Sequence, residues 1–147
     1  MIHFEGTETF PLAIDTLSMK LSDAGFLARC LADAVVTEAT PDRAVWSVKP
    51  KLTFLSGELH TICTASDKQP AAQVRFRLET KGIGSASVVE AKLDFAPDGT
   101  GTLVKWVGDM TSMTGLLKLA PKGLVEATAK KVIAEAWAGI HKKLAAA

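Results

Sequence analysis

Hydrophobic positions recur every three or four residues over the last thirty residues of the chain, and this stretch predicts the longest element. Its apolar members share one face of a helix, and they are Val125, Ala129, Val132, Ile133, Ala136, Trp137, Ile140 and Leu144. Pro121 and Gly123 can interrupt the helix, so residues 116–120 are predicted as a first, kinked segment. An apolar face this wide has to be covered by the rest of the chain.

The first third of the chain predicts one strand and two short helices. Residues 2–10 alternate between apolar and polar, as a strand does. Pro11 suits the first position of a helix, and apolar residues follow it at helical spacing as far as residue 21. Residues 22–25 break this helix, and residues 26–31 form a second brief one.

From residue 34 onward the pattern has a period of two and predicts six further strands. Residues 40–42 and 98–101 have the composition of hairpin turns, and a bulge or bend is expected at residues 56–57. The predicted strands are residues 35–39, 43–48, 51–65, 72–80, 89–95 and 103–110.

These elements predict an α+β fold with a helix-grip arrangement. Successive hairpins with short turns make an antiparallel sheet of about seven strands, which twists and curls. The long C-terminal helix is the element able to fill the concave side of that sheet. A sheet that curls around a helix leaves space between them, and a ligand is expected there. Residues 1–147 are predicted to form one domain.

Composition excludes several classes of protein. Lys and Arg number 17 and Asp and Glu 16, with no basic block, which argues against nucleic acid as a partner. No uncharged apolar run approaches the ~18 residues of a membrane-spanning helix, and the first residues lack the basic start of a secretory signal. The two cysteines have neither metal spacing nor the density of a disulfide scaffold, so we expect a cytoplasmic protein with reduced thiols.

Residues with catalytic or metal-binding potential do not converge in the predicted fold. His3, His60 and His141 lie on three different elements, and His60 and Cys63 fall on opposite faces of one strand. The chain has no tyrosine, no nucleophile elbow and no phosphate-binding glycine loop. We therefore expect no catalytic residues, no metal and no cofactor, and a cavity lined by apolar side chains.

The candidate ligand-binding residues are the large apolar side chains on the predicted inner faces. They are Phe54, Leu59, Phe76, Leu78, Val89, Leu93, Trp106, Met110, Met113, Leu117 and Trp137. For any single member, ordinary core packing is the alternative.

Several short segments together resemble the carbon monoxide dehydrogenase G-subunit family, which belongs to the superfamily of START domains, the birch pollen allergen and polyketide cyclases. These segments are residues 21–30 with Leu21-Ser22-Asp23, residues 54–58, residues 82–91, residues 97–99 and residues 102–106. The resemblance implies the helix-grip fold and a ligand-binding or accessory protein, with a molybdenum hydroxylase complex as a possible partner.

Residues and resemblance together favour a protein that binds a hydrophobic small molecule such as a lipid, a quinone or a polyketide-like compound, as an accessory or carrier protein. Two alternatives stay open. A cyclase or hydrolase-like enzyme would need polar groups converging in the cavity, and an assembly factor for a molybdenum hydroxylase would act through an exposed apolar surface around residues 116–119.

Overall fold

The computed structural model describes residues 2–49 and 57–145, and it contains seven strands and four helices in that part of the chain. In chain order they are β1 (Ile2–Phe10), α1 (Ile14–Leu21), α2 (Ala24–Arg29), β2 (Val35–Ala39), β3 (Arg43–Val48), β4 (Leu59–Gln69), β5 (Gln73–Gly82), β6 (Ser85–Asp98), β7 (Gly101–Gly115), α3 (Leu116–Leu119) and α4 (Lys122–Ala145).

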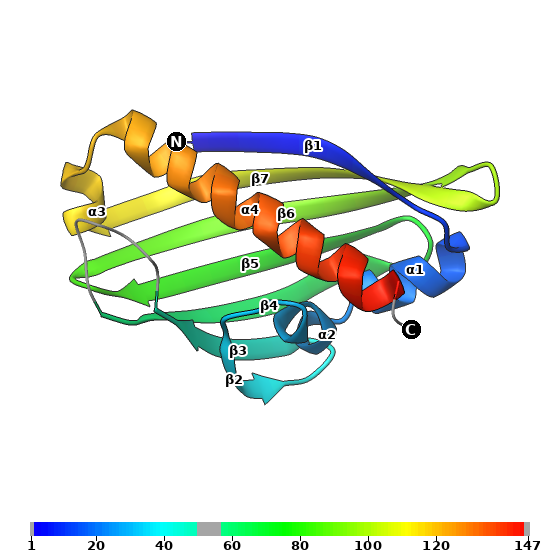
Figure 1. Cartoon of the computed structure of the whole chain (residues 1–147), viewed down its shortest axis with the longest axis horizontal. Coiled ribbons are helices and arrows are strands. Elements are labelled where there is room, and N and C mark those ends of the chain that lie inside the picture. Colours follow the sequence, from blue (N-terminus) through cyan, green and yellow to red (C-terminus); the bar gives the residue numbers. More distant parts are fainter. Residues whose placement is uncertain (1, 50–56, 146–147) are drawn as a thin grey trace.

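The strands form one antiparallel sheet in the order β1-β7-β6-β5-β4-β3-β2. The sheet is curved and α4 lies across its concave side, while α1 and α2 lie at one end (Figure 1). The predicted α+β helix-grip fold is therefore confirmed. The strand order leaves β1 and β2 as the two edges of the sheet, so one side of β1 faces α4 without a neighbouring strand.

The boundaries of β4 to β7 differ from those predicted, and the largest differences are at the start of β6 and the end of β7. β6 begins at Ser85, four residues before the predicted start, and β7 continues to Gly115. The register shifts between Val88 and Val89, which face Ser112 and Met110, so Thr111 is an extra residue in β7. This bulge reverses the alternation of inward and outward side chains and hides the strand from a period-two pattern. The predicted strand at residues 51–54 lies outside the described residues.

Hydrogen bonds and a close helix contact hold α2 in place at its end of the sheet. The Asp23 side chain caps α2 by accepting a hydrogen bond from the Phe26 N–H at 3.0 Å. The Ala24 N–H donates to the Pro41 carbonyl at 2.9 Å, which ties α2 to the β2–β3 hairpin. Gly139 lets α4 approach the same region, because a Cβ there would overlap the Cys30 carbonyl oxygen.

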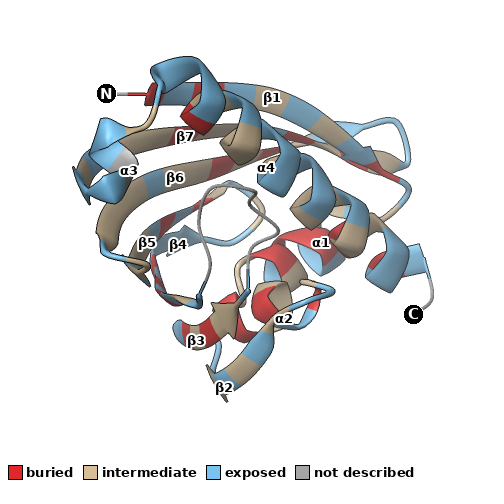
Figure 2. Ribbon diagram, turned by 60° about the vertical axis from the view of Figure 1, so that its left-hand side comes forward, coloured by how far each residue is buried: buried red, intermediate tan, exposed pale blue. Residues whose placement is uncertain are grey.

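The hydrophobic core has two parts. The larger lies between α1, α2, the last turns of α4 and the nearer ends of the strands, where buried residues are concentrated in Figure 2. The smaller contains Ile2, Phe4 and Val125 at the other end of α4. The buried residues of α4 are Val125, Ile140 and Leu144, near its two ends, and between them its inward side chains are only half-buried. The helix is thus fully buried only near its ends, and its middle is half-buried where Ile133 and Trp137 pack against the core.

One predicted member of the buried helix face is wrong. Val132 is 58% exposed. At 100° per residue the buried arc of α4 centres near Ile140 and Ile133, and Val132 lies about 80° from that centre. Apolar residues spaced three and four apart show that the helix has an apolar face. The spacing does not determine which residues at the edge of that face contact the sheet and which are exposed to solvent. No helix of residues 2–49 and 57–145 is long and apolar enough to cross a membrane.

Candidate functional site

An open groove of about 770 Å³ lies between the edge strand β1 and helix α4. From the strands it is lined by His3, Phe4, Glu5, Glu8 and Trp106, and from the helix by Lys130, Ile133, Ala134, Trp137, Ala138 and His141. Its volume falls in the range of about 300–1,000 Å³ that is typical of small-molecule sites.

On the strand side the groove depends on a glycine. Gly6 pairs with Trp106 in the β1–β7 register, and both point toward the concave side. A Cβ built on Gly6 would lie 2.7 Å from Cζ2 of the Trp106 indole, so only glycine leaves room for the ring against β1. The indole N–H of Trp106 is buried and has no hydrogen-bond partner within the described residues.

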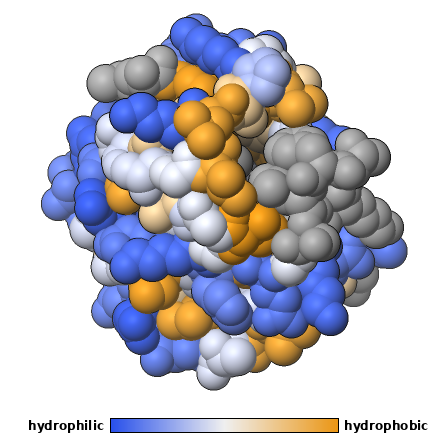
Figure 3. All heavy atoms as spheres, turned by 90° about the vertical axis from the view of Figure 1, so that its left-hand side faces the viewer, coloured by the Kyte–Doolittle hydropathy of each residue, from blue (hydrophilic) through white to orange (hydrophobic). Residues whose placement is uncertain are grey.

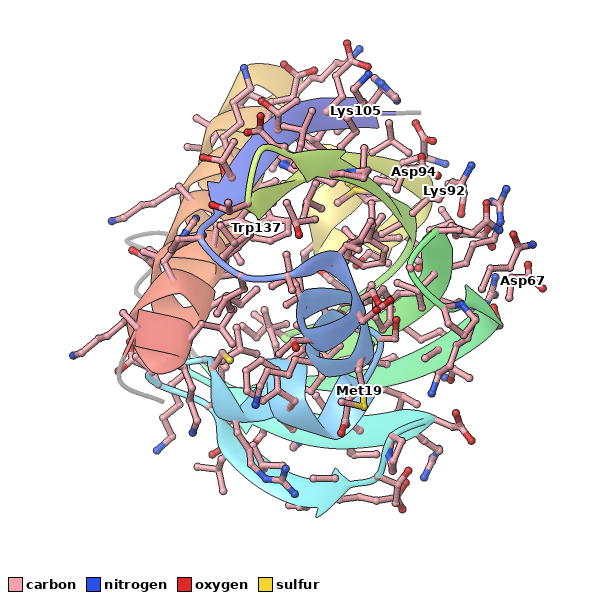
Figure 4. The ribbon with its side chains drawn as sticks, turned by 90° about the vertical axis from the view of Figure 1, so that its right-hand side faces the viewer. Met19, Asp67, Lys92, Asp94, Lys105 and Trp137 are labelled. Atoms are coloured by element: carbon pink, nitrogen blue, oxygen red, sulfur yellow. The ribbon has the colours of Figure 1, made fainter. Side chains whose placement is uncertain are left out.

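On the helix side the lining residues follow one stripe. Lys130, Ile133, Ala134, Trp137 and His141 succeed one another at intervals of three, one, three and four, which places them on one face of α4 beside the core-facing one. In Figure 4 Trp137 lies on the side of α4 that faces the strands.

Aromatic rings line the floor of the groove. The ring centroids of Trp106 and Trp137 are 6.2 Å apart, and those of Phe10 and Trp137 are 6.3 Å apart. These separations are typical of aromatic pairs in contact. The groove is therefore apolar along its centre.

One end of the groove is polar. Glu8 Oε1 accepts a hydrogen bond from His141 Nε2 at 3.0 Å, and the imidazole of His141 stacks on Phe10 with centroids 4.2 Å apart. The sequence alone indicates a surface or singly hydrogen-bonded position for His141, and the structure shows one hydrogen bond there; the sequence does not single out Glu8 as a site residue. A signal for Glu8 is nevertheless present, because it occupies an inward position of β1 where Ile2 and Phe10 are apolar.

A second polar group lies at the rim, on the outer face of β1. His3 bonds Asp109 through Nδ1 and Glu5 through Nε2, and these two carboxylates, Asp109 foremost, raise the pKa of His3 above its ordinary value. Both contacts are exposed to solvent. The contact with Asp109 joins β1 to β7 at the rim of the groove, whereas the contact with Glu5 lies within β1.

The predicted ligand-binding residues separate into three groups. Trp106 and Trp137 line the groove, whereas Met110 and Met113 line a smaller hollow of about 200 Å³ with Ile2. The other described members all lie at inward strand positions, half-buried or buried, and they are Leu59, Phe76, Leu78, Val89 and Leu93. Phe54 lies outside the described residues, and so does the side chain of Leu117.

Gly108 lies on the concave face next to Trp106 along β7, and there is room for an added Cβ at this position. A Cβ built on it would approach no atom closer than Val89 Cγ1, at 4.0 Å, apart from its chain neighbours. Its partner in β6 is Ala91, which also has a small side chain. Gly108 itself is buried, and a single added methyl group would make ordinary contact with Val89 without displacing a neighbour.

Nucleophilic and metal-binding groups do not gather at the groove. Burial raises the pKa of the Cys63 thiol to about 12, and burial also raises that of Cys30. These thiols stay protonated near neutral pH and are poor nucleophiles. Within the described ranges no three His, Cys, Asp or Glu side chains lie close enough together to hold a metal ion.

The fold is shared with solved structures of low sequence identity. A conserved protein from Geobacillus kaustophilus superposes with a TM-score of 0.84 at 16% identity, over 98% of this chain and 95% of that one. A START superfamily protein from Mycobacterium smegmatis gives 0.67 at 15% identity, over 97% and 98%. DynU16, a protein of the dynemicin biosynthetic locus, gives 0.60 at 13% identity, over 97% of this chain and 46% of that one.

Sequence comparison adds a family. No curated protein sequence matches the chain. The sequence model of the carbon monoxide dehydrogenase G-subunit family, CoxG, matches residues 6–145, which include β1 from Gly6, the whole of the rest of the sheet and all of α4. With nearly its full length matched, the chain belongs to the carbon monoxide dehydrogenase G-subunit (CoxG) family.

Proposed function

We propose that the chain binds one hydrophobic small molecule, such as a lipid, a quinone or a polyketide-like compound, between α4 and the inner face of β1 and β7. In this proposal it is a cytoplasmic carrier or accessory protein and not an enzyme. The observation that carries the proposal is the half-buried middle of α4, where Ile133 and Trp137 line a groove of about 770 Å³.

The energetics of such a site are favourable. A ligand that buries about 300 Å² of apolar surface gains roughly 7 kcal/mol at ~25 cal/mol per Å², before the entropic cost of association. The space above Gly108 and the unpaired indole N–H of Trp106 both fit a site that is completed by a ligand. Ordinary cores leave few such vacancies and few unsatisfied buried donors.

Tryptophan fluorescence tests this function directly. The chain has three tryptophans, and in a Trp46→Phe background the two that remain, Trp106 and Trp137, both line the groove. Titration with fatty acids, fatty alcohols, quinones and flavonoid probes should give a saturable, one-to-one change. Gly108→Leu should abolish it by filling the vacant space, whereas Gly123→Leu should not, because Gly123 lies on the surface of α4 with open space around it. If no probe saturates, the proposed function is wrong.

A second candidate function rests on a separate surface. Leu116, Leu119 and Leu124 are exposed around the α3–α4 corner, Leu119 by 81%, and hydrophobic surface is visible at this end of the molecule in Figure 3. Exposed apolar patches mark protein contacts. Together with the family membership this supports an accessory role beside a carbon monoxide dehydrogenase, a molybdenum hydroxylase.

The docking role is testable without the ligand. Leu119→Gln should weaken binding to purified carbon monoxide dehydrogenase in a calorimetric titration and leave probe binding in the groove intact. Met19→Gln is the matched control, because Met19 is an equally exposed apolar residue on α1 at the opposite end of the molecule (Figure 1). Equal affinity of the Leu119→Gln variant and the unmodified chain would refute docking through this corner.

A further inference from the structure

We propose that the ligand of the groove carries a hydroxyl group that donates a hydrogen bond to Glu8, and that the groove discriminates against carboxylate head groups. This inference rests on the proposed function and specifies the chemistry of its ligand. It follows from the position, the free hydrogen-bonding capacity and the electrostatic surroundings of Glu8.

The position of Glu8 is unusual for a carboxylate. Along β1 the inward positions are Ile2, Phe4, Gly6, Glu8 and Phe10, so Glu8 is the one charged residue among them. Its side chain is 27% exposed and lines the groove. A charged side chain is rarely placed among aromatic rings unless its hydrogen bonds are satisfied there.

The hydrogen bonds that Glu8 makes leave capacity unused. Oε1 accepts from His141 Nε2, and in the part of the chain that the structure describes no group donates to Oε2. An ionised carboxylate accepts hydrogen bonds and donates none, and its two oxygens offer about four acceptor sites. A ligand group that meets Oε2 must therefore supply a hydrogen. Alcohols and phenols do so, whereas a ketone, an ester or an ionised fatty acid does not.

The charges on the strand side of the groove disfavour an anionic head. Glu8 and Glu5 on β1 repel such a head, and Lys130 on α4 is the one lysine among the residues that line the groove. His3, at the rim, is engaged by Asp109 and Glu5. A hydroxyl meets no such repulsion on either wall, and it can donate to Glu8 while accepting a hydrogen bond from water at the open side.

The apolar part of the ligand has a defined direction. From Glu8 the groove continues along β1 past Trp106 and Ile133 to Phe4, and four strand residues span about 13 Å. The large side chains along this path are apolar, with the polar His3, Glu5 and Lys130 also among the lining residues, and Gly108 pairs with Phe4 at its far end. A head at Glu8 and an aliphatic or ring system toward Phe4 thus match the polar and apolar ends of the groove.

Three probes with the same twelve-carbon tail test the inference. We expect 1-dodecanol to bind the Trp46→Phe protein at least about tenfold more tightly than dodecanoate, because only the alcohol donates a hydrogen bond to Glu8 and the anion is repelled. Dodecylamine tests whether a cationic donor binds in place of the hydroxyl. All three are titrated below their micelle-forming concentrations at neutral pH. In Glu8→Gln the preference for dodecanol over dodecanoate should fall to about twofold or less, because the anion is no longer repelled and the acceptor is neutral.

Controls separate this inference from the proposed function. Glu90→Gln makes the same change on the outer face of β6 and should leave the preference unchanged. Urea unfolding checks that Glu8→Gln keeps the fold, which the equal size of the two side chains favours. If the three probes bind equally, if an ion binds more tightly than dodecanol, or if Glu8→Gln keeps the preference, the hydroxyl assignment is wrong and ligand binding stands. If none of the three binds while quinone probes do, the assignment is also wrong. If no probe of any class binds, both proposals are wrong.

Discussion

The same substitution at two glycines of the concave face should have opposite effects on stability. Gly6→Ala places a Cβ 2.7 Å from the indole of Trp106, whereas Gly108→Ala places one 4.0 Å from Val89 Cγ1. Neither glycine has the positive φ that would strain an alanine by itself. The two variants therefore differ in the space available to one methyl group and in little else.

The expected magnitudes follow from that difference. Alanine restricts the unfolded chain more than glycine and stabilises the fold by about 0.4–1 kcal/mol where the native conformation allows it. Gly108→Ala should show this gain. Gly6→Ala adds an overpacking cost of about 1–3 kcal/mol, because the rigid indole has to move as a unit. Both variants gain the same stabilisation from the restricted unfolded chain. Their free energies of unfolding should therefore differ by the overpacking cost alone, about 1–3 kcal/mol.

Urea unfolding measures this difference. With m near 2 kcal/mol per M, the midpoint of Gly6→Ala should lie about 0.5–1.5 M below that of Gly108→Ala, at unchanged m. The native tryptophan emission should shift in Gly6→Ala and stay constant in Gly108→Ala. Equal midpoints would show that the Trp106 ring does not lie against Gly6. A loss of stability in Gly108→Ala would show that the space above β7 is already filled.

Three further predictions concern groups elsewhere in the fold. Thr102 is fully buried and its Oγ1 donates a hydrogen bond to the Leu12 carbonyl at 2.7 Å. Thr102→Val removes this donor and should lower the free energy of unfolding by about 1–3 kcal/mol. If Thr102→Ser, which keeps the hydroxyl, lowers it by as much as Thr102→Val does, the loss does not come from the hydrogen bond. Burial raises the pKa of Cys63 to about 12, so a thiol reagent at about pH 8 should label it only after unfolding, and rapid labelling of the native protein would show an open path to it. Asp109 and Glu5 raise the pKa of His3, so protonated His3 stabilises the fold fully below its ordinary value of 6.5, and this advantage is lost as the pH rises through the raised value. The urea midpoint should therefore exceed that of His3→Gln at about pH 5.5 and match it at about pH 9, and a constant difference would contradict the linkage.

The sequence predicted the sheet well because alternation is a local property. Val74 and Phe76 in β5, and Val104 and Trp106 in β7, all face the concave side as their spacing indicated. The two-residue turn between Asp98 and Gly101 also lies where the glycines placed it. Each of these features depends on neighbours within a few residues, which a single sequence displays directly.

The groove depends on distant parts of the chain, and for that reason it was only partly predicted. Glu8 and His141 are 133 positions apart, and they meet because α4 crosses the free edge of β1 at one angle. The crossing also decides that Val132 faces solvent while Trp137 faces the groove. Periodicity shows that a helix has an apolar face, but the angle at which it packs on a sheet is set by contacts between elements.

The central claim is that the space beside α4 holds a hydrophobic molecule. Native mass spectrometry of the protein after incubation with fatty alcohols, fatty acids, quinones and flavonoid probes tests it most directly. The account predicts a one-to-one adduct above the 15.6 kDa chain with at least one class of probe, retained in Gly123→Leu and absent in Gly108→Leu. The account is contradicted if only the mass of the unliganded protein is observed with every probe. It is also contradicted if Gly108→Leu forms the same adduct as the unmodified protein.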